Sequence, residues 1–545
     1  MSTPEKKPRR WPILVVLSLA LSIIIIDTTL LNVSLSSIIR DLNTDIQSLQ
    51  WVISGYALTL AALTITGGRL GDLFGRKRMF VLGAIIFAVG SFITSISTTI
   101  PVMIIGEAII EGIGAALMMP ATSSLLVANF KGRDRALAFG VWGGIAGASA
   151  ALGPILGGYL TTSYSWRWGF RINLVVALVL VIGSFLIPES QDREEKPTLD
   201  WVGVLLSSFG MLSFIFGVIE SSTYGWWNAK QVFMAFGHSI DFGGLSIVPP
   251  AILLGVILLV AFYSWERSVD HRGETPLVSP KLFANRQFTS GAITTSVMSL
   301  GQAGLIFSVP VFLQSVRGYS AFDTGLSFLP MSIMLLIVAP LGAFLSARVE
   351  PKRLIQLGLL INIVAVFVLR QGFSVDATVW SMVPGLSLYG MGMGLVMSQI
   401  NNLTLSAVSV EEAGEASGVN NTLRQAGSSL GAAIIGAVLL SALATNLTTG
   451  IHASSVIPDS LKDRLSTAAT EQTSNVEFSG GSNVSHNLPQ VIVDEVTSIS
   501  HQATVDADKA SLLWAALFAV LGFLVSFQLP KGKNVEKNES LASKH

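Results

Sequence analysis

The fold is decided by the stretch Gly68-Arg69-Leu70-Gly71-Asp72-Leu73-Phe74-Gly75-Arg76-Lys77-Arg78. It separates two apolar runs, at roughly 50–66 and 79–98, that are each long enough to cross a bilayer. A connection this short must reverse the chain at the membrane surface, and its glycines suit a tight turn. Because short loops rich in Lys and Arg remain in the cytoplasm, the basic residues at its end place this turn inside the cell.

The composition is that of a membrane protein. Hydrophobic residues make up 51% of the 545 residues and charged residues only 12%, whereas soluble domains carry about 25% charged residues. The formal net charge is zero, which gives no indication of a nucleic-acid partner. There is no cysteine, the six histidines show no zinc spacing, and no GxxxxGK[ST] phosphate loop occurs. We therefore expect no metal site and no ATP-driven pump.

Fourteen apolar stretches are long enough to be transmembrane helices, at about twenty residues per crossing. The first follows a basic start, is longer than a signal-peptide core and lacks an A-x-A cleavage site, so we interpret it as an uncleaved helix. The run 222–247 is too mixed to cross and is interpreted as an external loop. The predicted spans are roughly 11–35, 50–67, 79–98, 101–125, 137–161, 169–187, 200–220, 248–265, 288–314, 325–347, 353–371, 379–405, 418–446 and 510–529.

The basic residues are distributed unevenly between the two sides that fourteen crossings create. Of the 34 Lys and Arg residues, 23 fall on the side of the 68–78 turn, 9 fall on the other side, and Arg69 and Arg424 lie near helix ends. The positive-inside rule then predicts a multi-pass protein of the cell membrane with both termini in the cytoplasm.

The order G-x-L-x-D-x-x-G-R-K in the 68–78 turn resembles the loop between helices 2 and 3 of the major facilitator superfamily. The resemblance implies two helix bundles and a loop that latches them together on the inside. The stretch 342–353 repeats the pattern of the 68–78 turn less closely, with Ala347 in the place of Asp72. This indicates that the two halves of the chain are related by a parallel repeat. The implied gating-loop residues are Gly68, Asp72, Gly75, Arg76 and Lys77.

The layout resembles the fourteen-helix drug:proton antiporter branch (multidrug efflux permeases) of that superfamily. It implies an N-terminal six-helix bundle at 1–199, an inserted transmembrane pair at 200–265, a C-terminal six-helix bundle at 266–530 and a cytoplasmic tail at 531–545. The second bundle includes an external segment, 450–509, that is rich in Ser, Thr and Asn. We interpret it as a variable surface loop, with a lid or a partner site as the alternative.

The span at 137–161 contains a run that resembles the antiporter motif of proton-driven exporters. Small residues four apart let a neighbouring helix approach closely, and a proline inside a helix removes one backbone hydrogen bond and bends it. Generic small-residue packing is the alternative to a role in transport. The motif residues are Gly153, Pro154, Gly157 and Gly158.

Asp27 lies in an otherwise apolar part of the first span. A charge at mid-membrane costs at least about 2.5 kcal/mol, so an intramembrane acid is a functional candidate by default. Its position matches the acidic position in the first helix of the branch that the layout resembles, which implies proton coupling or substrate contact. The alternative is a structural role, such as a bond to Thr28 or to a neighbouring helix.

Glu107 and Glu111 are the other acidic candidates. They are four residues apart, so they share one helical face, and we expect Glu107 near the level of Asp27. The family pattern has an Arg where this chain has Ala108, so the usual basic partner is missing. Desolvation and like charges both favour the neutral carboxyl form, which suits reversible protonation. Bonding of this face to polar neighbours is the alternative.

Arg424 is a further charge inside a predicted span. We interpret it as a structural charge that contacts backbone carbonyls or Glu415, with a substrate role as the alternative.

Together these features predict an all-α membrane protein of the major facilitator fold that exports amphipathic, cationic compounds in exchange for protons. We expect a monomer whose partners are a small-molecule substrate, protons and the lipid bilayer, with no nucleic acid and no cofactor beyond the proton gradient. An enzyme is disfavoured because no nucleophile, metal or nucleotide constellation occurs. The alternatives are an exporter of an endogenous metabolite or lipid-like compound with the same fold, or a non-transporting membrane receptor.

Overall fold

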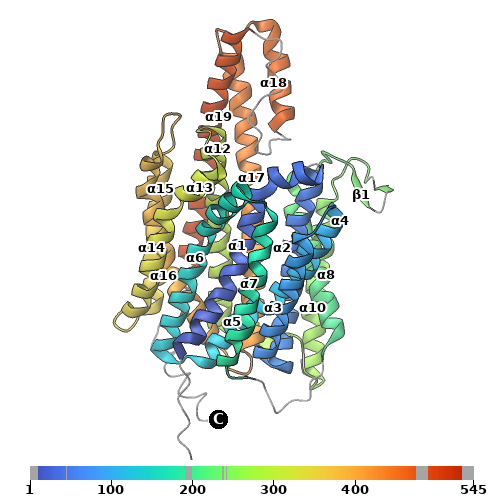
Figure 1. Cartoon of the computed structure of the whole chain (residues 1–545), viewed down its shortest axis with the longest axis vertical. Coiled ribbons are helices and arrows are strands. Elements are labelled where there is room, and N and C mark those ends of the chain that lie inside the picture. The colour runs from blue at the N-terminus through green and yellow to red at the C-terminus, as the bar shows by residue number, and fades with distance from the viewer. Residues whose placement is uncertain are drawn as a thin grey trace, which may run out of the picture.

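The computed structural model describes residues 10–44, 46–190, 199–235, 238–240, 242–473 and 489–530, which form a bundle of long helices (Figure 1). Apolar runs become helices here because a helix satisfies its own backbone hydrogen bonds in lipid. In chain order the elements are α1 (Arg10–Leu42), α2 (Ile46–Phe74), α3 (Arg76–Ser95), α4 (Ile100–Met103), η1 (Ile104–Glu111), α5 (Gly112–Asn129), α6 (Gly132–Ser163), α7 (Arg167–Gly183), η2 (Ser184–Leu186), α8 (Trp201–Ile219), α9 (Ser221–Tyr224), β1 (Phe233–Ala235), β2 (His238–Ile240), α10 (Val248–His271), α11 (Pro280–Ala284), α12 (Arg286–Ser315), α13 (Ala321–Ser327), α14 (Leu329–Leu345), α15 (Pro351–Gln371), α16 (Val379–Leu405), α17 (Ala413–Ala453), α18 (Asp459–Thr473) and α19 (Gln490–Ser526).

The predicted number of crossings is confirmed. Among the described residues, fourteen stretches of helix are long and apolar enough to cross a membrane. One of them, Ile100–Asn129, changes its winding along its length, because η1 between α4 and α5 is a π-helix. Side-chain caps begin several of the helices: Asp200, Asn285 and Ser320 each accept a hydrogen bond from a first-turn backbone N–H.

The two ends of the bundle differ, and we name them by what they carry. The basic end carries the 68–78 turn, the start of α1 and the end of α19. Arg10 lies 3.6 Å from Asp134 at the start of α6, and Lys352 Nζ donates to the carbonyls of Phe527 and Leu529 at 2.7 and 2.8 Å. The extension end is opposite, where α17, α18 and α19 rise beyond the other helices (Figure 1).

Helix α6 forms one seam between the earlier and the later helices. It packs against α1 and α7 and also against α13, α14 and α16. Polar bonds cross this seam at two levels: Ser332 Oγ donates to the carbonyl of Gly147 at 3.3 Å, and Arg135 Nε donates to Asn402 Oδ1 at 2.9 Å.

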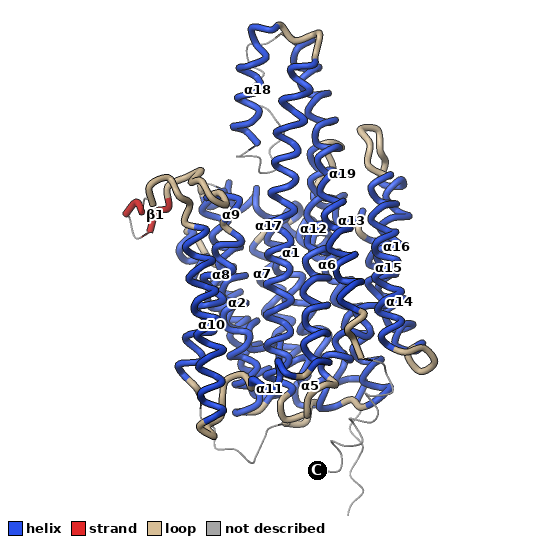
Figure 2. Tube along the Cα trace, turned by 180° about the vertical axis from the view of Figure 1, so that it is seen from behind, coloured by secondary structure: helices blue, strands red, loops and turns tan. Residues whose placement is uncertain are grey.

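Helix α17 forms the second seam, because it packs against α2 and α5. Ser417 Oγ donates to the carbonyl of Pro120 at 3.2 Å across this contact. Helices α8 and α10 pair with one another, and α8 also touches both α2 and α17. The pair predicted at 200–265 therefore lies beside this seam, at the edge of the molecule (Figure 2).

The segment 450–509 is not a surface loop where the structure describes it. Helix α17 continues to Ala453, α18 covers Asp459–Thr473, and α19 begins at Gln490. The extension has a small apolar core in which Ile451, Ile457, Leu465 and Ile492 are buried. Leu461 and Leu465 in α18, and Ile492, Val496 and Ile499 in α19, are three or four residues apart and so share one helical face. That periodicity is hidden in a Ser- and Thr-rich composition.

The connection at 222–247 contains no crossing helix in its described part, as predicted. It carries a short antiparallel hairpin in which Phe233 pairs with Ile240 and Met234 with Ser239. The hairpin lies at the extension end (Figure 1).

Candidate functional site

Asp72 and Arg76 hold the start of α17, and we call these two side chains together with residues 410–415 the latch. The Asp72 carboxylate accepts from Arg76 Nε and Nη2 at 2.9 and 2.6 Å. It also accepts from the backbone N–H groups of Gly414 and Glu415 at 3.1 and 2.8 Å. A carboxylate in this position satisfies free donors of the first turn of α17 and complements its dipole.

Arg76 completes the latch from the other direction. Its Nη2 donates to the carbonyls of Val410 and Glu411, the latter at 2.8 Å. Both Asp72 and Arg76 are only 2% exposed. The gating loop predicted from the resemblance is therefore a buried contact between the α2–α3 turn and α17.

The glycines of the 68–78 stretch were predicted to form a tight turn, but they do not all lie in it. Helix α2 continues to Phe74, so Gly68 is helical and only Gly75 makes the turn, with φ of +105°. At Gly68 an added Cβ would lie 2.3 Å from the carbonyl oxygen of Gly414, so this glycine permits close packing of α2 on α17. Lys77 is outside the latch, because its backbone N–H donates to Glu189 at 3.0 Å and its side chain lies over the ring of Phe185.

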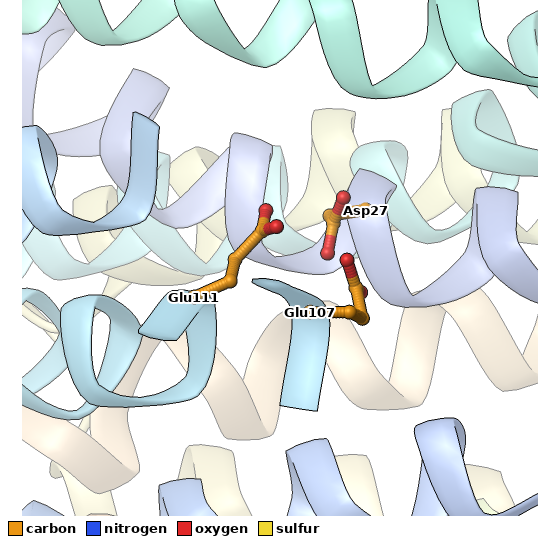
Figure 3. A group of neighbouring side chains, drawn as sticks. All are labelled: Asp27, Glu107 and Glu111. Atoms are coloured by element: carbon orange, nitrogen blue, oxygen red, sulfur yellow. The ribbon is translucent and has the colours of Figure 1, made fainter. Parts of the chain in front are cut away.

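Asp27, Glu107 and Glu111 form a cluster that we call the acid triad. One carboxylate oxygen of each lies within 4.8 Å of the other two, and the side chains point toward one another from α1 and η1 (Figure 3). Asp27 is 1% exposed and both glutamates are 0% exposed. The structure thus brings the predicted acids together, but in a closed cluster and not on the wall of an open cavity.

Few donors serve the acid triad. Asn173 Nδ2 lies 2.7 Å from Asp27 Oδ1 and 3.2 Å from Glu111 Oε1, and Ser91 Oγ donates to Glu111 Oε1 at 2.5 Å. The other four carboxylate oxygens, including both of Glu107, have no donor among the described residues. None of the three acids has an ion pair with a basic side chain in that part of the chain.

The winding of the fourth crossing places both glutamates in the triad. Glu107 and Glu111 lie in the π-helix η1, in which each turn is wider than in an α-helix. An added Cβ at Gly90 of α3 would lie 2.5 Å from the backbone nitrogen of Glu111, so α3 packs closely on this segment and brings Ser91 to the cluster. Tyr56 of α2 is buried within electrostatic range of all three carboxyls.

The predicted antiporter motif packs against α1 next to Asp27. An added Cβ at Gly153 would lie 1.7 Å from Thr29 Oγ1, and one at Gly157 would lie 3.1 Å from Leu30. On the neighbouring face of α6, Pro154 lies against Gly325 and Gly158 against Phe322 of α13. These small residues therefore set how closely α6 approaches α1 and α13 at once.

Among the described residues, the hydrogen bonds of Arg424 go to neither of its predicted partners. Its Nη2 lies 3.2 Å from Asn421 Oδ1 and 3.7 Å from Met119 Sδ of α5. Glu415 instead accepts from the backbone N–H of Ser279 at 2.5 Å. Arg424 is thus a cation at the α5–α17 contact and not part of an ion pair with Glu415.

The acid triad has fewer hydrogen-bond donors than carboxylate oxygens among the described residues, and this shortage determines what chemistry it can perform. Three carboxylates without a basic neighbour cannot all be ionised in a dehydrated site, because each buried charge is costly. They must take up protons or hold one small cation, and the oxygen spacing suits either. This arrangement is chemically suited to binding positive charge.

Sequence reasoning missed several residues that matter here. Ser91 and Tyr56 gave no signal, because polar residues are common in these spans, while Asn173 stood in an apolar helix without an assigned role. Asp508 was counted outside the membrane because the last span was predicted to begin at 510. It lies inside α19 and is 0% exposed.

Comparison with known proteins identifies the family. The model of the Major Facilitator Superfamily matches residues 17–432. The probable actinorhodin transporter of Streptomyces coelicolor is 29% identical over 97% of this chain and 93% of that protein. The puromycin resistance protein pur8 of Streptomyces alboniger is 32% identical over 81% of this chain and 84% of that protein. The multidrug resistance protein Stp of Mycobacterium tuberculosis is 28% identical over 82% of this chain and 78% of that protein.

Solved structures share the fold at low sequence identity. The human organic anion transporter MFSD10 has a TM-score of 0.56 at 11% identity, covering 95% of this chain and 100% of that chain. The proton:xylose symporter XylE bound to a glucose derivative has a TM-score of 0.56 at 13% identity, covering 98% of each chain. The predicted all-helical fold of this superfamily is confirmed.

Proposed function

The chain belongs to the Major Facilitator Superfamily, a family of transporters and not of enzymes, and we propose that it is a proton-coupled exporter of amphipathic, cationic compounds. The efflux direction is supported by relatives whose names denote export or resistance to antibiotics. The single observation that carries the coupling proposal is the acid triad, a buried cluster of three carboxyls in which four oxygens have no hydrogen-bond donor among the described residues.

In the proposed coupling, protons and the cationic substrate compete for the acid triad. In the closed state the triad keeps protons, because its four remaining oxygens have no other donor among the described residues. When the bundle opens toward the basic end, a cation approaching the triad lowers the cost of ionising it, and a proton leaves. Opening toward the extension end reverses the exchange. The latch holds the basic end shut in the conformation described here.

A polar cavity supports a cationic cargo. It has a volume of about 160 Å³, lies at the latch, and has Arg69 as its only basic lining residue. Its five acidic lining residues are Asp72, Asp270, Glu411, Glu412 and Glu415. Such a negative vestibule concentrates cations where a substrate would enter from the cytoplasm.

The membrane arrangement is part of the same proposal. We place the basic end and both termini in the cytoplasm of a multi-pass protein of the cell membrane, and we treat the chain as a monomer. Two six-helix bundles, at 1–199 and 266–530, rock about the α6 and α17 seams, and the pair at 200–265 flanks them. An exporter of an endogenous metabolite with the same coupling is the second candidate for the cargo.

The proposal is tested in proteoliposomes that contain the purified full chain and a fluorescent lipophilic cation. An imposed proton gradient, acidic on the extension side, is expected to drive the dye toward that side, whereas a sodium gradient of equal size is not. Transport driven by sodium and not by protons would assign the triad to a metal cation. Transport of an uncharged analogue at the same rate would show that the transported compound need not carry a positive charge.

A further inference from the structure

Asp508 is a second buried acid that the triad mechanism does not use. It lies in α19, in the second half of the chain, and is 0% exposed. Neither of its carboxylate oxygens has a hydrogen-bond donor among the described residues. On the same helical face, Val505 and Leu512 belong to an apolar cluster that includes Phe312 and Phe373. Burying a carboxyl in these surroundings without a hydrogen-bond donor costs free energy in either protonation state, and the cost is largest for the ionised form.

In the part of the chain that the structure describes, no neighbouring charge compensates Asp508. Helix α19 packs against α12, α15 and α17. The only charged residue of α12 is Arg286, at the basic end, and α17 has none between Arg424 and His452. On α15, Arg370 donates to the backbone carbonyl of Lys509 at 3.3 Å, and no ion pair joins it to Asp508 in the described chain. On α19 itself the nearest charged residues are Asp506 and Lys509.

A file of polar side chains connects Asp508 with the extension end. Ser500 is half-buried, Thr504 is 6% exposed, and Thr504 Oγ1 donates to the carbonyl of Ser500 at 2.8 Å. These residues precede Asp508 by one and two helical turns on one face. On the other side, Ser511 Oγ lies 2.6 Å from Ser308 Oγ of α12. Burial thus increases steadily from the extension end to Asp508.

We propose that Asp508 is a second proton-binding site, loaded from the extension end. Binding adds one proton to one carboxylate oxygen and removes its negative charge, and release from that oxygen reverses the step. A metal ion does not fit, because hard cations need several oxygen ligands and no second carboxylate joins Asp508 in a cluster among the described residues. A proton needs a single acceptor, and the polar file gives it a path through α19.

The site would connect the extension with the transport cycle. Helices α17 and α19 form both the extension and the wall around Asp508. When the two bundles move apart at the extension end, water reaches the end of the second bundle that carries Asp508 and hydrates the carboxyl, so the proton exchanges with that side only. In the closed state described here, the site holds its proton.

The test reads the protonation state of Asp508 by infrared difference spectroscopy on the full chain in lipid. The difference between the spectra of wild type and Asp508→Asn is expected to contain the carbonyl band of a neutral carboxyl at neutral pH. Wild type minus Asp506→Asn, at an exposed position two residues away, is expected to show the bands of an ionised carboxylate. In vesicles, Asp508→Asn is expected to flatten the dependence of export on the pH at the extension side.

Two results would overturn this assignment: ionised-carboxylate bands for Asp508, or unchanged dependence of export on extension-side pH in Asp508→Asn. The neutral band is also expected in a Glu111→Gln background, so failure of the triad proposal and failure of this one are distinguishable. If Asp508→Asn does not accumulate, a hydrophobic carbodiimide, which modifies protonated carboxyls in lipid, is expected to label wild-type Asp508 and spare Asp506. Absence of this label together with labelling of the acid triad would equally contradict the proposal.

Discussion

The latch and the acid triad are both built from buried carboxyls, but their surroundings are opposite. Asp72 is served by Arg76 and by two backbone N–H groups at the start of α17. The triad has one amide and one hydroxyl for three carboxyls. A carboxylate with a full set of donors is held as an anion, whereas one without donors is pushed to its neutral form.

This difference separates two roles that the same side chain can have in a membrane. Asp72 is a clamp, because its charge is compensated locally and its bonds join distant segments of the chain. In the proposed mechanism the triad is an exchangeable store of positive charge, because four of its carboxylate oxygens have no other donor among the described residues. Removing the negative charge should therefore damage the latch in every respect but impair the triad only in transport.

The largest effect is expected from removing a titratable group of the triad. Glu107→Gln and Glu111→Gln should each abolish proton-driven exchange, because an amide of the same size imitates a permanently protonated acid. The measurement is dye export from proteoliposomes under an imposed proton gradient. Glu274→Gln, at an exposed acid of the basic end, is the control that should keep wild-type export. Full coupling in both triad variants would leave Asp27 as the only candidate.

The second effect is expected at the latch. Asp72→Asn loses the ion pair with Arg76 and weakens the bonds to Gly414 and Glu415, so export should fall by about tenfold, the equivalent of about 1.4 kcal/mol. Arg76→Ala should behave similarly, and Lys77→Ala, one residue away but outside the latch, should export at nearly the wild-type rate. Equal losses in the Arg76 and Lys77 variants would show that the turn acts by its charge alone.

The third prediction concerns stability and contrasts the two regions directly. Asp72→Asn should destabilise the protein by about 1.5–3 kcal/mol, as expected for hydrogen bonds to a charged group. Glu107→Gln should leave the melting temperature in detergent unchanged or raise it, since it removes a buried ionisable group without losing a donor. Thermal unfolding of the two variants beside wild type measures this, and a lower melting temperature for Glu107→Gln would mean that Glu107 is a structural anion.

The smallest effect is expected where a paired acid is exposed. Asp41 at the extension end accepts from Arg167, which lowers the pKa of Asp41 below its ordinary value. A lowered pKa in the folded state contributes stability above the ordinary pKa of Asp, and this contribution disappears as the pH falls through the lowered value. Because the pair is partly solvated, Asp41→Asn should cost less than about 1 kcal/mol. A cost comparable with that of Asp72→Asn would remove the distinction between buried and exposed pairs.

Much of the fold was predictable because membrane spans are long and uniform. Fourteen crossings, the position of the α2–α3 turn and the three acids of the triad follow from apolar runs and from charges that interrupt them. The extension was not, because its apolar face is diluted by Ser and Thr. Leu461 and Leu465, and likewise Ile492, Val496 and Ile499, have helical spacing, but this repeat appears only when spacing is counted and composition is ignored. Missing it also placed Asp508 in an external loop and not inside a helix.

The details of the site depended on packing that no local pattern encodes. The π-helix that carries Glu107 and Glu111 packs closely on α3 at Gly90, which lies in a separate span. The partner of Asp72 is the start of α17, hundreds of residues away, and only the folded chain shows that its donors are backbone N–H groups. The same holds for Asn173, whose amide reaches two acids from two other helices.

The most direct test of the account is the number of protons released when a lipophilic organic cation binds to the purified protein. Titration calorimetry in buffers of different ionisation enthalpy gives this number for wild type, for Glu274→Gln and for the triple variant Asp27→Asn, Glu107→Gln, Glu111→Gln. The account predicts that wild type and Glu274→Gln release at least one proton per bound cation and that the triple variant releases none. Equal release by the triple variant and wild type would contradict the claim that the acid triad carries the exchanged protons.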